Sequence, residues 1–211
     1  MANETTLSVQ GQYLDSGGFT SSAACVVGHW ADDPTNGALR FANVQINKNQ
    51  SLDAAYLVYK YGDVGDAGNW KFKLYGIDED NTASFGYPFG RPKTSASNTY
   101  DEGAPTSGGT KTMNVKSILQ EITSRSGWSS GNAVGFLLED NGSANNVFAF
   151  ASLTNSYLVY RISSEPNFKP TPKSIAAPTF PTTSDYGIRI SKSGVDVRTA
   201  TESQLFFTTR K

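Results

Sequence analysis

The chain has 211 residues, enough to bury the core of one ordinary domain without metal or disulfide staples. Its 18 basic and 19 acidic residues leave a net charge of −1, which excludes the large positive surface that nucleic-acid binding needs. One cysteine excludes an internal disulfide framework, and one histidine excludes most histidine-based catalytic schemes. No run approaches 18 apolar residues, so we expect no membrane contact through a spanning helix, and the first ten residues lack signal-peptide features.

Short alternating runs separated by turn-forming residues predict a mainly β protein. The clearest run is 70–75, in which Trp70, Phe72 and Leu74 should face a core while Lys71 and Lys73 face water. Residues 54–59 are apolar on both faces, which indicates a central strand. Further strands are predicted at 7–13, 24–27, 39–46, 134–138, 147–151 and 157–162. Eight strands fit a jelly-roll β-sandwich, and 85–113 is predicted to be a long loop.

One segment, 114–126, is predicted to form a short α-helix. Val115, Ile118, Leu119 and Ile122 recur at helical spacing and define one apolar face. Asn114 can cap the start, Arg125 suits the last turn and Gly127 can stop the helix. A helix of about three turns is marginal by itself in water, so we expect it to pack on a sheet, with Trp128 as an anchor.

The composition changes after residue 162, and we divide the chain there. Residues 1–162 form the predicted sandwich domain, and five of the nine prolines fall within 163–186, which predicts an extended arm or linker. Residues 1–162 carry a net charge of −4 and residues 163–211 a net charge of +3. This opposition suits contact between neighbouring copies or with another acidic surface, and a solvated tail is the alternative.

The last segment, 187–211, regains apolar residues and is predicted to end the arm in a small β-hairpin with a turn at 192–194. A hairpin by itself is marginal in water. We therefore expect it to pack on another chain or on a neighbouring subunit's sheet edge, with folding back onto the same domain as the alternative. The candidate assembly residues are Ile188, Ile190, Val195, Val197, Leu205, Phe206 and Phe207.

No motif in the sequence carries catalytic chemistry, so we predict that the protein is not an enzyme and uses no cofactor or metal. His29 and Cys25 are interpreted as structural residues at strand positions. The run from Asp78 to Asp80 is predicted to be an acidic turn, because it lacks the spacing of the helix-loop-helix calcium motif. A structural Ca²⁺ near Asp78 and Asp80 is the alternative.

Aromatic residues are the other candidates for function, since exposed rings can stack on sugars or anchor protein interfaces. Tyr59, Tyr61, Tyr87 and Phe89 are the predicted ligand-binding residues. Filling the core of the sandwich is the alternative role for each ring.

Several motifs in order resemble a known module. They are Leu39–Ile46, Ala54–Leu57, Tyr75–Phe85, Arg91–Thr94 and Gln120–Asn132. This order resembles a jelly-roll domain of bacterial surface proteins and phage structural proteins, akin to carbohydrate-binding modules. The resemblance covers about 28–162 and implies a jelly-roll fold without catalytic residues.

A second resemblance covers the end of the chain. Residues 186–197 and 199–205 are similar to a short segment that recurs in tailed-phage virion proteins, often with Pro where this chain has Ser193. Together the two resemblances imply a phage virion structural protein, either a head decoration protein or a surface protein of the tail or neck. Its partners would be other virion proteins and copies of itself, as a homo-oligomer or assembled on the particle. The alternative function is a carbohydrate-binding module for adhesion to a host-surface glycan.

Overall fold

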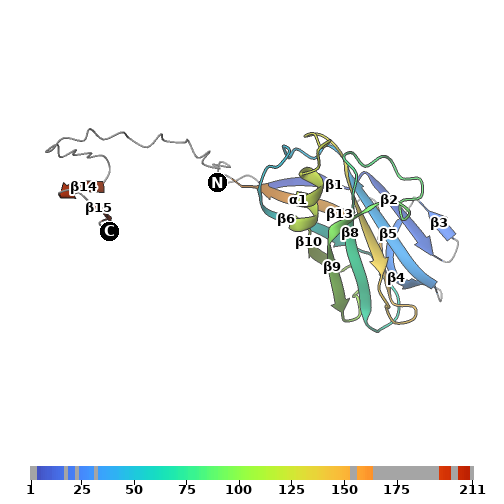
Figure 1. The fold of residues 1–211 in the computed structure, drawn as a ribbon. Helices are drawn as coiled ribbons and strands as arrows, with labels where there is room; N and C mark the ends of the chain where they lie inside the picture. The colour runs from blue at the N-terminus through green and yellow to red at the C-terminus, as the bar shows by residue number, and fades with distance from the viewer. Residues whose placement is uncertain are drawn as a thin grey trace. The chain divides into compact units, whose positions relative to one another are not determined.

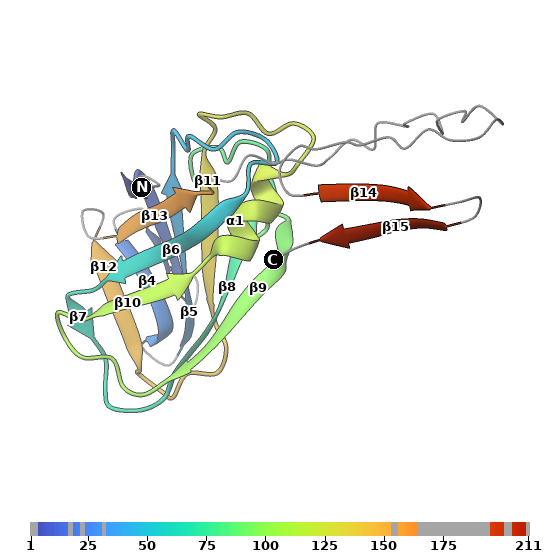
Figure 2. The ribbon, with the colours of Figure 1, turned by 90° about the vertical axis from the view of Figure 1, so that its left-hand side faces the viewer.

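The computed structural model describes residues 4–16, 19–21, 24–30, 33–152, 156–163, 195–200 and 204–209. The chain divides into two compact units, Met1–Phe168 and Lys169–Lys211. The first unit is a sandwich of two antiparallel sheets, and Figure 2 shows β13, β6 and β10 of one sheet in front of the other sheet. The mainly β prediction is therefore confirmed.

The smaller sheet, called sheet A below, contains four strands. Their order is β1 (Glu4–Ser8), β13 (Ser156–Ile162), β6 (Leu52–Lys60) and β10 (Thr110–Asn114). The predicted strand at 54–59 is the middle of β6, which lies inside the sheet between β13 and β10 as expected.

The larger sheet, called sheet B, has a main path of seven strands. Figure 1 shows β9, β8, β5 and β4 of this sheet, with β2 and β3 at the right-hand side. Their order is β7 (Asp63–Val64), β12 (Phe148–Ser152), β4 (Ala24–Trp30), β5 (Asp33–Phe41), β11 (Val134–Asp140), β8 (Trp70–Ile77) and β9 (Lys93–Glu102). Off this path, β2 (Gly11–Ser16) pairs with both β5 and β3 (Phe19–Ser21).

Eight of these strands have the order of a jelly roll. Numbered along the chain, β1, β5, β6, β8, β9, β10, β11 and β13 give the orders 1-8-3-6 in sheet A and 2-7-4-5 in sheet B. The sequence predicted eight strands, but not the same eight. Strands β4 and β12, which were predicted, pair with each other outside this set, whereas β9 and β10 occupy the stretch 85–113 that was predicted to be a loop.

Two predicted strands have different boundaries in the structure. The run 7–13 is two strands, because the chain crosses from sheet A to sheet B at Val9 and Gln10, whose backbone N–H groups bond to Ser156 and Arg40. The run 39–46 leaves the ladder after Phe41, since Asn43 has a left-handed φ of 60°. Val44 and Ile46 are still buried, so the alternating pattern continued although the strand ended.

The core between the sheets follows the period-two pattern. Trp70, Phe72 and Leu74 are buried, while Lys71 and Lys73 lie on the opposite, half-exposed face of β8, as predicted. Strand β4 passes close to β5 at Gly37. A Cβ atom at Gly37 would lie 2.5 Å from Cys25 Sγ and 2.8 Å from the Val26 carbonyl oxygen, so only glycine fits there.

The predicted helix exists as α1 (Lys116–Thr123), which contacts β6 of sheet A and both β8 and β9 of sheet B. Ile118, Leu119 and Ile122 are buried as expected. The helix is shorter than 114–126, and its cap residue is Val115, although Asn114 Oδ1 still accepts the Lys116 N–H at 2.9 Å. Arg125 lies beyond the last turn and pairs with carboxylates elsewhere, so it does not cap the helix. Trp128 is buried and donates to the Ile46 carbonyl oxygen, as an anchor should.

The second unit contains a β-hairpin, as the fold prediction required. Its strands are β14 (Val195–Ala200) and β15 (Gln204–Thr209), with Val197 opposite Phe207 and Thr199 opposite Leu205. The two strands are connected through 201–203, so the hairpin comes after the predicted turn at 192–194 and the predicted position of its turn is wrong. Ile188, Ile190 and 192–194 lie outside the described residues. Most of the predicted arm, from residue 164 to 186, also lies outside them.

Candidate functional site

The segment between β8 and β9, residues 78–92, covers part of the outer face of sheet B. Phe85 and Phe89 pack there beside Tyr13 and Tyr75, over a small buried cluster of Ala38, Ile77 and Leu137. The Arg40 guanidinium donates a 2.7 Å hydrogen bond to the Thr82 carbonyl oxygen and fixes the segment to β5. These contacts bring aromatic side chains from three parts of the sequence onto one face.

Tyr87 is the most exposed large aromatic side chain among the described residues, with 56% of its surface accessible. Its ring makes edge-to-face contacts with Tyr13 and Phe89, at centroid distances of 6.3 and 5.7 Å. Its hydroxyl donates a 2.9 Å hydrogen bond to Asp15 Oδ2, and this bond is the main reason that the pKa of Tyr87 is raised. The ring is therefore both accessible and held in place, as a stacking surface requires.

Charged groups of both signs surround this aromatic group. Lys93 Nζ forms an ion pair with Glu139 at 2.6 Å. The Lys73 and Lys93 ammonium groups each lie 4.9 Å from the centroid of the Tyr75 ring, within cation–π range. The face thus offers carboxylate acceptors, ammonium donors and aromatic rings together.

The four predicted ligand-binding aromatics separate into two pairs. Tyr87 and Phe89 lie together in the site just described. Tyr59 and Tyr61 are buried in the core, where they contact each other and Trp70. The Tyr59 hydroxyl lies 2.8 Å from the carbonyl oxygens of Cys25 and Ala149. The prediction that Tyr59 and Tyr61 bind a ligand is thus corrected, because neither ring is accessible for stacking.

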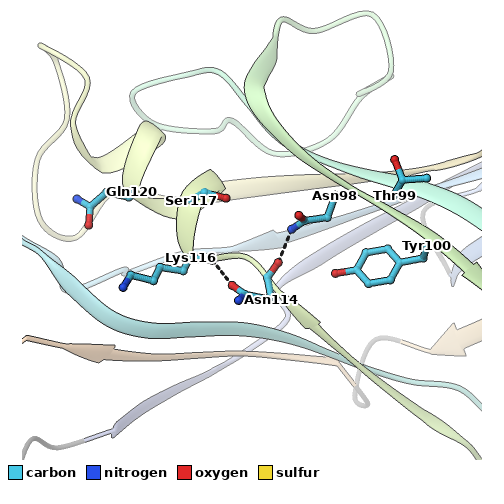
Figure 3. Close-up of a pocket in the computed structure, with 7 residues that line it drawn as sticks. All are labelled: Asn98, Thr99, Tyr100, Asn114, Lys116, Ser117 and Gln120. Carbon is cyan, nitrogen blue, oxygen red and sulfur yellow. Dashed lines mark hydrogen bonds between the residues drawn. The ribbon is translucent and has the colours of Figure 1, made fainter.

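A second candidate region is a hollow of about 450 Å³ where β9, β10 and the start of α1 meet (Figure 3). It is lined by Asn98, Thr99, Tyr100, Asn114, Lys116, Ser117 and Gln120. Asn98 Nδ2 donates to the Asn114 carbonyl oxygen and joins the edges of the two sheets. The Tyr100 ring stacks on Phe72 at 4.9 Å, with Lys111 Nζ 5.1 Å from its centroid.

The side chain of Arg125, just after α1, joins the acidic turn at Asp78 and Asp80 to the end of the helix. Arg125 pairs with Asp78, and its Nε donates to Asp80 Oδ1 at 2.8 Å. These pairs raise the pKa of Arg125, with the hydrogen bond to Asp78 as the largest cause. A guanidinium thus lies where the alternative prediction placed Ca²⁺, and within the described ranges no three His, Cys, Asp or Glu side chains are grouped to hold a metal ion.

Cys25 and His29 take the strand positions expected of them. Cys25 is a free thiol, fully buried, and burial raises its pKa to about 12. It therefore has little thiolate to react near neutral pH. His29 lies next to Trp30, the last residue of β4, and its backbone N–H donates to the Val147 carbonyl oxygen at 2.8 Å.

Of the assembly residues, Val195 and Val197 lie on β14, and Leu205, Phe206 and Phe207 lie on β15.

Across the part of the chain that the structure describes, no helix has the length and apolar character needed to cross a membrane. No protein-family model matches the sequence, and no curated protein matches it.

Sequence reasoning missed Tyr13, Asp15, Lys73 and Glu139 as members of the aromatic site. All four lie on the outer face of sheet B, in which β2, β5, β11 and β8 pair in that order. Period-two alternation placed Lys73 on a solvent face, but no local signal indicated which strands would be its neighbours.

Proposed function

We propose that this protein is a structural component of a tailed-phage virion, displayed on the head or tail surface and attached through its C-terminal unit. The proposal includes no catalytic activity. It is supported by the resemblance of 186–205 to a segment of tailed-phage virion proteins and by the division of the chain into two units. Copies of the chain and other virion proteins would be its partners.

The observation that carries the proposal is the small β-hairpin of the second unit. The described part of the second unit is the single pair β14–β15. Two strands bury too little apolar surface to be stable by themselves, so this pair needs further strands or another surface. A hairpin that gains its further strands or surface only on docking is a suitable attachment device, because the binding energy is gained in the assembled particle.

The body offers a free edge to such a strand. Strand β1 is the outermost strand of sheet A and pairs only with β13 among the described strands. Its other edge leaves backbone N–H and C=O groups free to pair with an added strand. The opposite charges of 1–162 and 163–211 favour contact between the body of one copy and the C-terminal segment of another.

The test uses full-length protein with both Val197→Asp and Phe207→Asp, which are opposite each other in the hairpin. We expect this variant to be lost from purified virions produced with the altered gene, while its sandwich melts at the wild-type temperature. Thr110→Asp with Thr112→Asp, on an exposed face of β10, is the matched control and should be incorporated normally. Full incorporation of the hairpin variant would disprove attachment through this unit.

Carbohydrate recognition is a second candidate function, favoured by the exposed and fixed ring of Tyr87 beside Asp15 and Glu139. Rings of this kind stack on sugars, while carboxylates accept sugar hydroxyls. A glycan array probed with the full-length chain tests it directly. Absence of binding to every glycan at high protein concentration would remove this candidate and leave the structural role unaffected.

A further inference from the structure

Five polar residues follow one another across the outer face of sheet B, one from each of five strands. They are called the polar row: Asp15 on β2, Asn36 on β5, Glu139 on β11, Lys73 on β8 and Thr99 on β9. Asp15 is opposite Asn36, and Lys73 is opposite both Glu139 and Thr99. Asn36 links the part of the row on β2 and β5 to the part on β11, β8 and β9, because its Oδ1 accepts the N–H of Asp140, next to Glu139.

The polar row is long and continuous. Strands lie about 4.8 Å apart, so five strands span about 19 Å from the first row residue to the last. Its members are half-buried or exposed, whereas their strand neighbours Leu14, Leu74 and Leu138 face the interior. A ligand in this row would therefore be extended and would cross the strands rather than follow one of them.

The charges along the row are balanced. Two carboxylates, an ammonium group, an amide and a hydroxyl lie in line, with Lys93 paired to Glu139. Within the described ranges, the Lys73 ammonium forms no ion pair and lies over the Tyr75 ring instead. Such a surface supplies alternating donors and acceptors without a net field, which suits many neutral hydroxyl groups better than a charged polymer.

The two ends of the row differ in their surroundings. At the first end, the Tyr87 ring is bonded to Asp15. At the other end, Thr99 is exposed on β9, the last strand of the main path of sheet B. Figure 3 shows the Thr99 side chain directed away from those of Asn98 and Tyr100, which reach toward β10 and α1. The row thus runs from an exposed aromatic ring to an exposed hydroxyl group at the edge of sheet B.

A protein strand is a poor occupant for this side of the sheet. The start of β9 is closed to an added strand, because the Glu121 carboxylate accepts the N–H groups of Ser95 and Ala96 at 2.7 and 2.8 Å. The face of the row itself carries charged residues, which the centres of protein interfaces avoid. These two facts favour a hydroxyl-rich small polymer over a second chain.

We propose that the polar row is the binding track of an uncharged, extended glycan, which stacks on Tyr87 at one end and reaches Thr99 on the edge strand β9 at the other. This inference rests on the carbohydrate recognition proposed above and names its ligand class and orientation. Affinity should rise with the number of sugars until the track is filled, since each added sugar reaches another strand of the row.

The test is affinity electrophoresis of the full-length chain through gels that contain a neutral β-glucan, mannan or galactan, and through gels with polygalacturonate or heparin. Tyr87→Ala and Lys73→Ala alter the track. Tyr56→Ala and Lys60→Ala are matched controls, because they remove an exposed tyrosine and an exposed lysine from β6 in sheet A. For a polymer that retards the wild type, titration then runs from the disaccharide to the hexasaccharide.

We expect a neutral polymer to retard the wild type and both controls, while each track variant binds about tenfold more weakly. Equal retardation of all variants, or no gain in affinity with chain length, would overturn the track but leave carbohydrate recognition standing. Retardation by acidic polymers alone would overturn the proposal that the bound glycan is uncharged. If no polymer retards the protein, both the track and carbohydrate recognition are wrong.

Discussion

The hydroxyl of Tyr87 donates a 2.9 Å hydrogen bond to Oδ2 of Asp15, so an exposed ring in the β8–β9 segment is tied to strand β2, 72 residues earlier in the sequence. Without this bond the ring would have more freedom and would lose more entropy on binding a ligand. The stacking surface thus depends on a contact that brings together two distant parts of the chain.

Tyr87→Phe tests this bond, since it keeps the ring and removes the hydroxyl. We expect a loss of less than about 1 kcal/mol in the free energy of unfolding, because the site is exposed to solvent. The bond raises the pKa of Tyr87, so its contribution is complete below the ordinary tyrosine pKa of about 10 and is lost as the pH rises through the higher folded value. Melting temperatures of the two proteins should differ at pH 8 and converge at strongly alkaline pH; a constant difference would contradict the assignment.

Cys25 should make the sandwich sensitive to alkali. Burial raises the pKa of its thiol from 9.0 to about 12, so the folded state favours the neutral form. This contribution is complete below pH 9 and is lost as the pH rises toward 12, because only the unfolded chain releases the proton easily. We expect Cys25→Ala to flatten the fall of the urea unfolding midpoint between pH 9 and pH 11. An unchanged slope would show that other groups, such as buried Tyr59, account for it.

Gly37→Ala should be strongly destabilising. The new methyl group would meet Cys25 Sγ at 2.5 Å and the backbone oxygen of Val26 at 2.8 Å, so β4 would have to move away from β5. Overpacking of this kind costs about 1–3 kcal/mol. Gly62→Ala is the matched control, because nothing lies within 4 Å of its added Cβ atom. Chemical denaturation should separate the two variants, and equal midpoints would refute the close approach of the strands.

Arg125→Gln should loosen the start of the β8–β9 segment. The change removes the ion pairs with Asp78 and Asp80, which are partly exposed, so we expect a cost of about 1 kcal/mol or less. The clearer effect should be faster amide hydrogen exchange in 78–92, with exchange in β6 unchanged. Exchange that is unaltered in 78–92 would mean that the packing of Phe85 and Phe89 holds the segment without the ion pairs.

Strand faces that follow from the alternation of apolar and polar residues were predicted correctly from the sequence. Features that depend on contacts with distant parts of the chain were missed. Trp70, Phe72 and Leu74 were placed correctly, because one strand suffices to define two faces. Strands β9 and β10 were missed, since few of their residues are apolar; Met113 is the one buried apolar side chain on β10.

The aromatic site was predicted only in part for the same reason. Tyr59 shares its face of β6 with Ala55 and Leu57, and this pattern, read strictly, would have placed it in the core. Tyr87 lies between glycine and proline in a stretch without periodicity. Its exposure follows from the packing of Phe85 and Phe89 on residues of β2, β5, β8 and β11, which sequence alone does not bring together.

The pairing of β1 with β13 sets Glu4 directly opposite Arg161, so the chain enters and leaves the sandwich at the same corner. A module whose two connections emerge side by side can be spliced into a loop of an unrelated host protein without stretching either. The fold is thus suited to being carried as a transplantable cassette, whose two sheets stay intact while the sequences joined to it are exchanged.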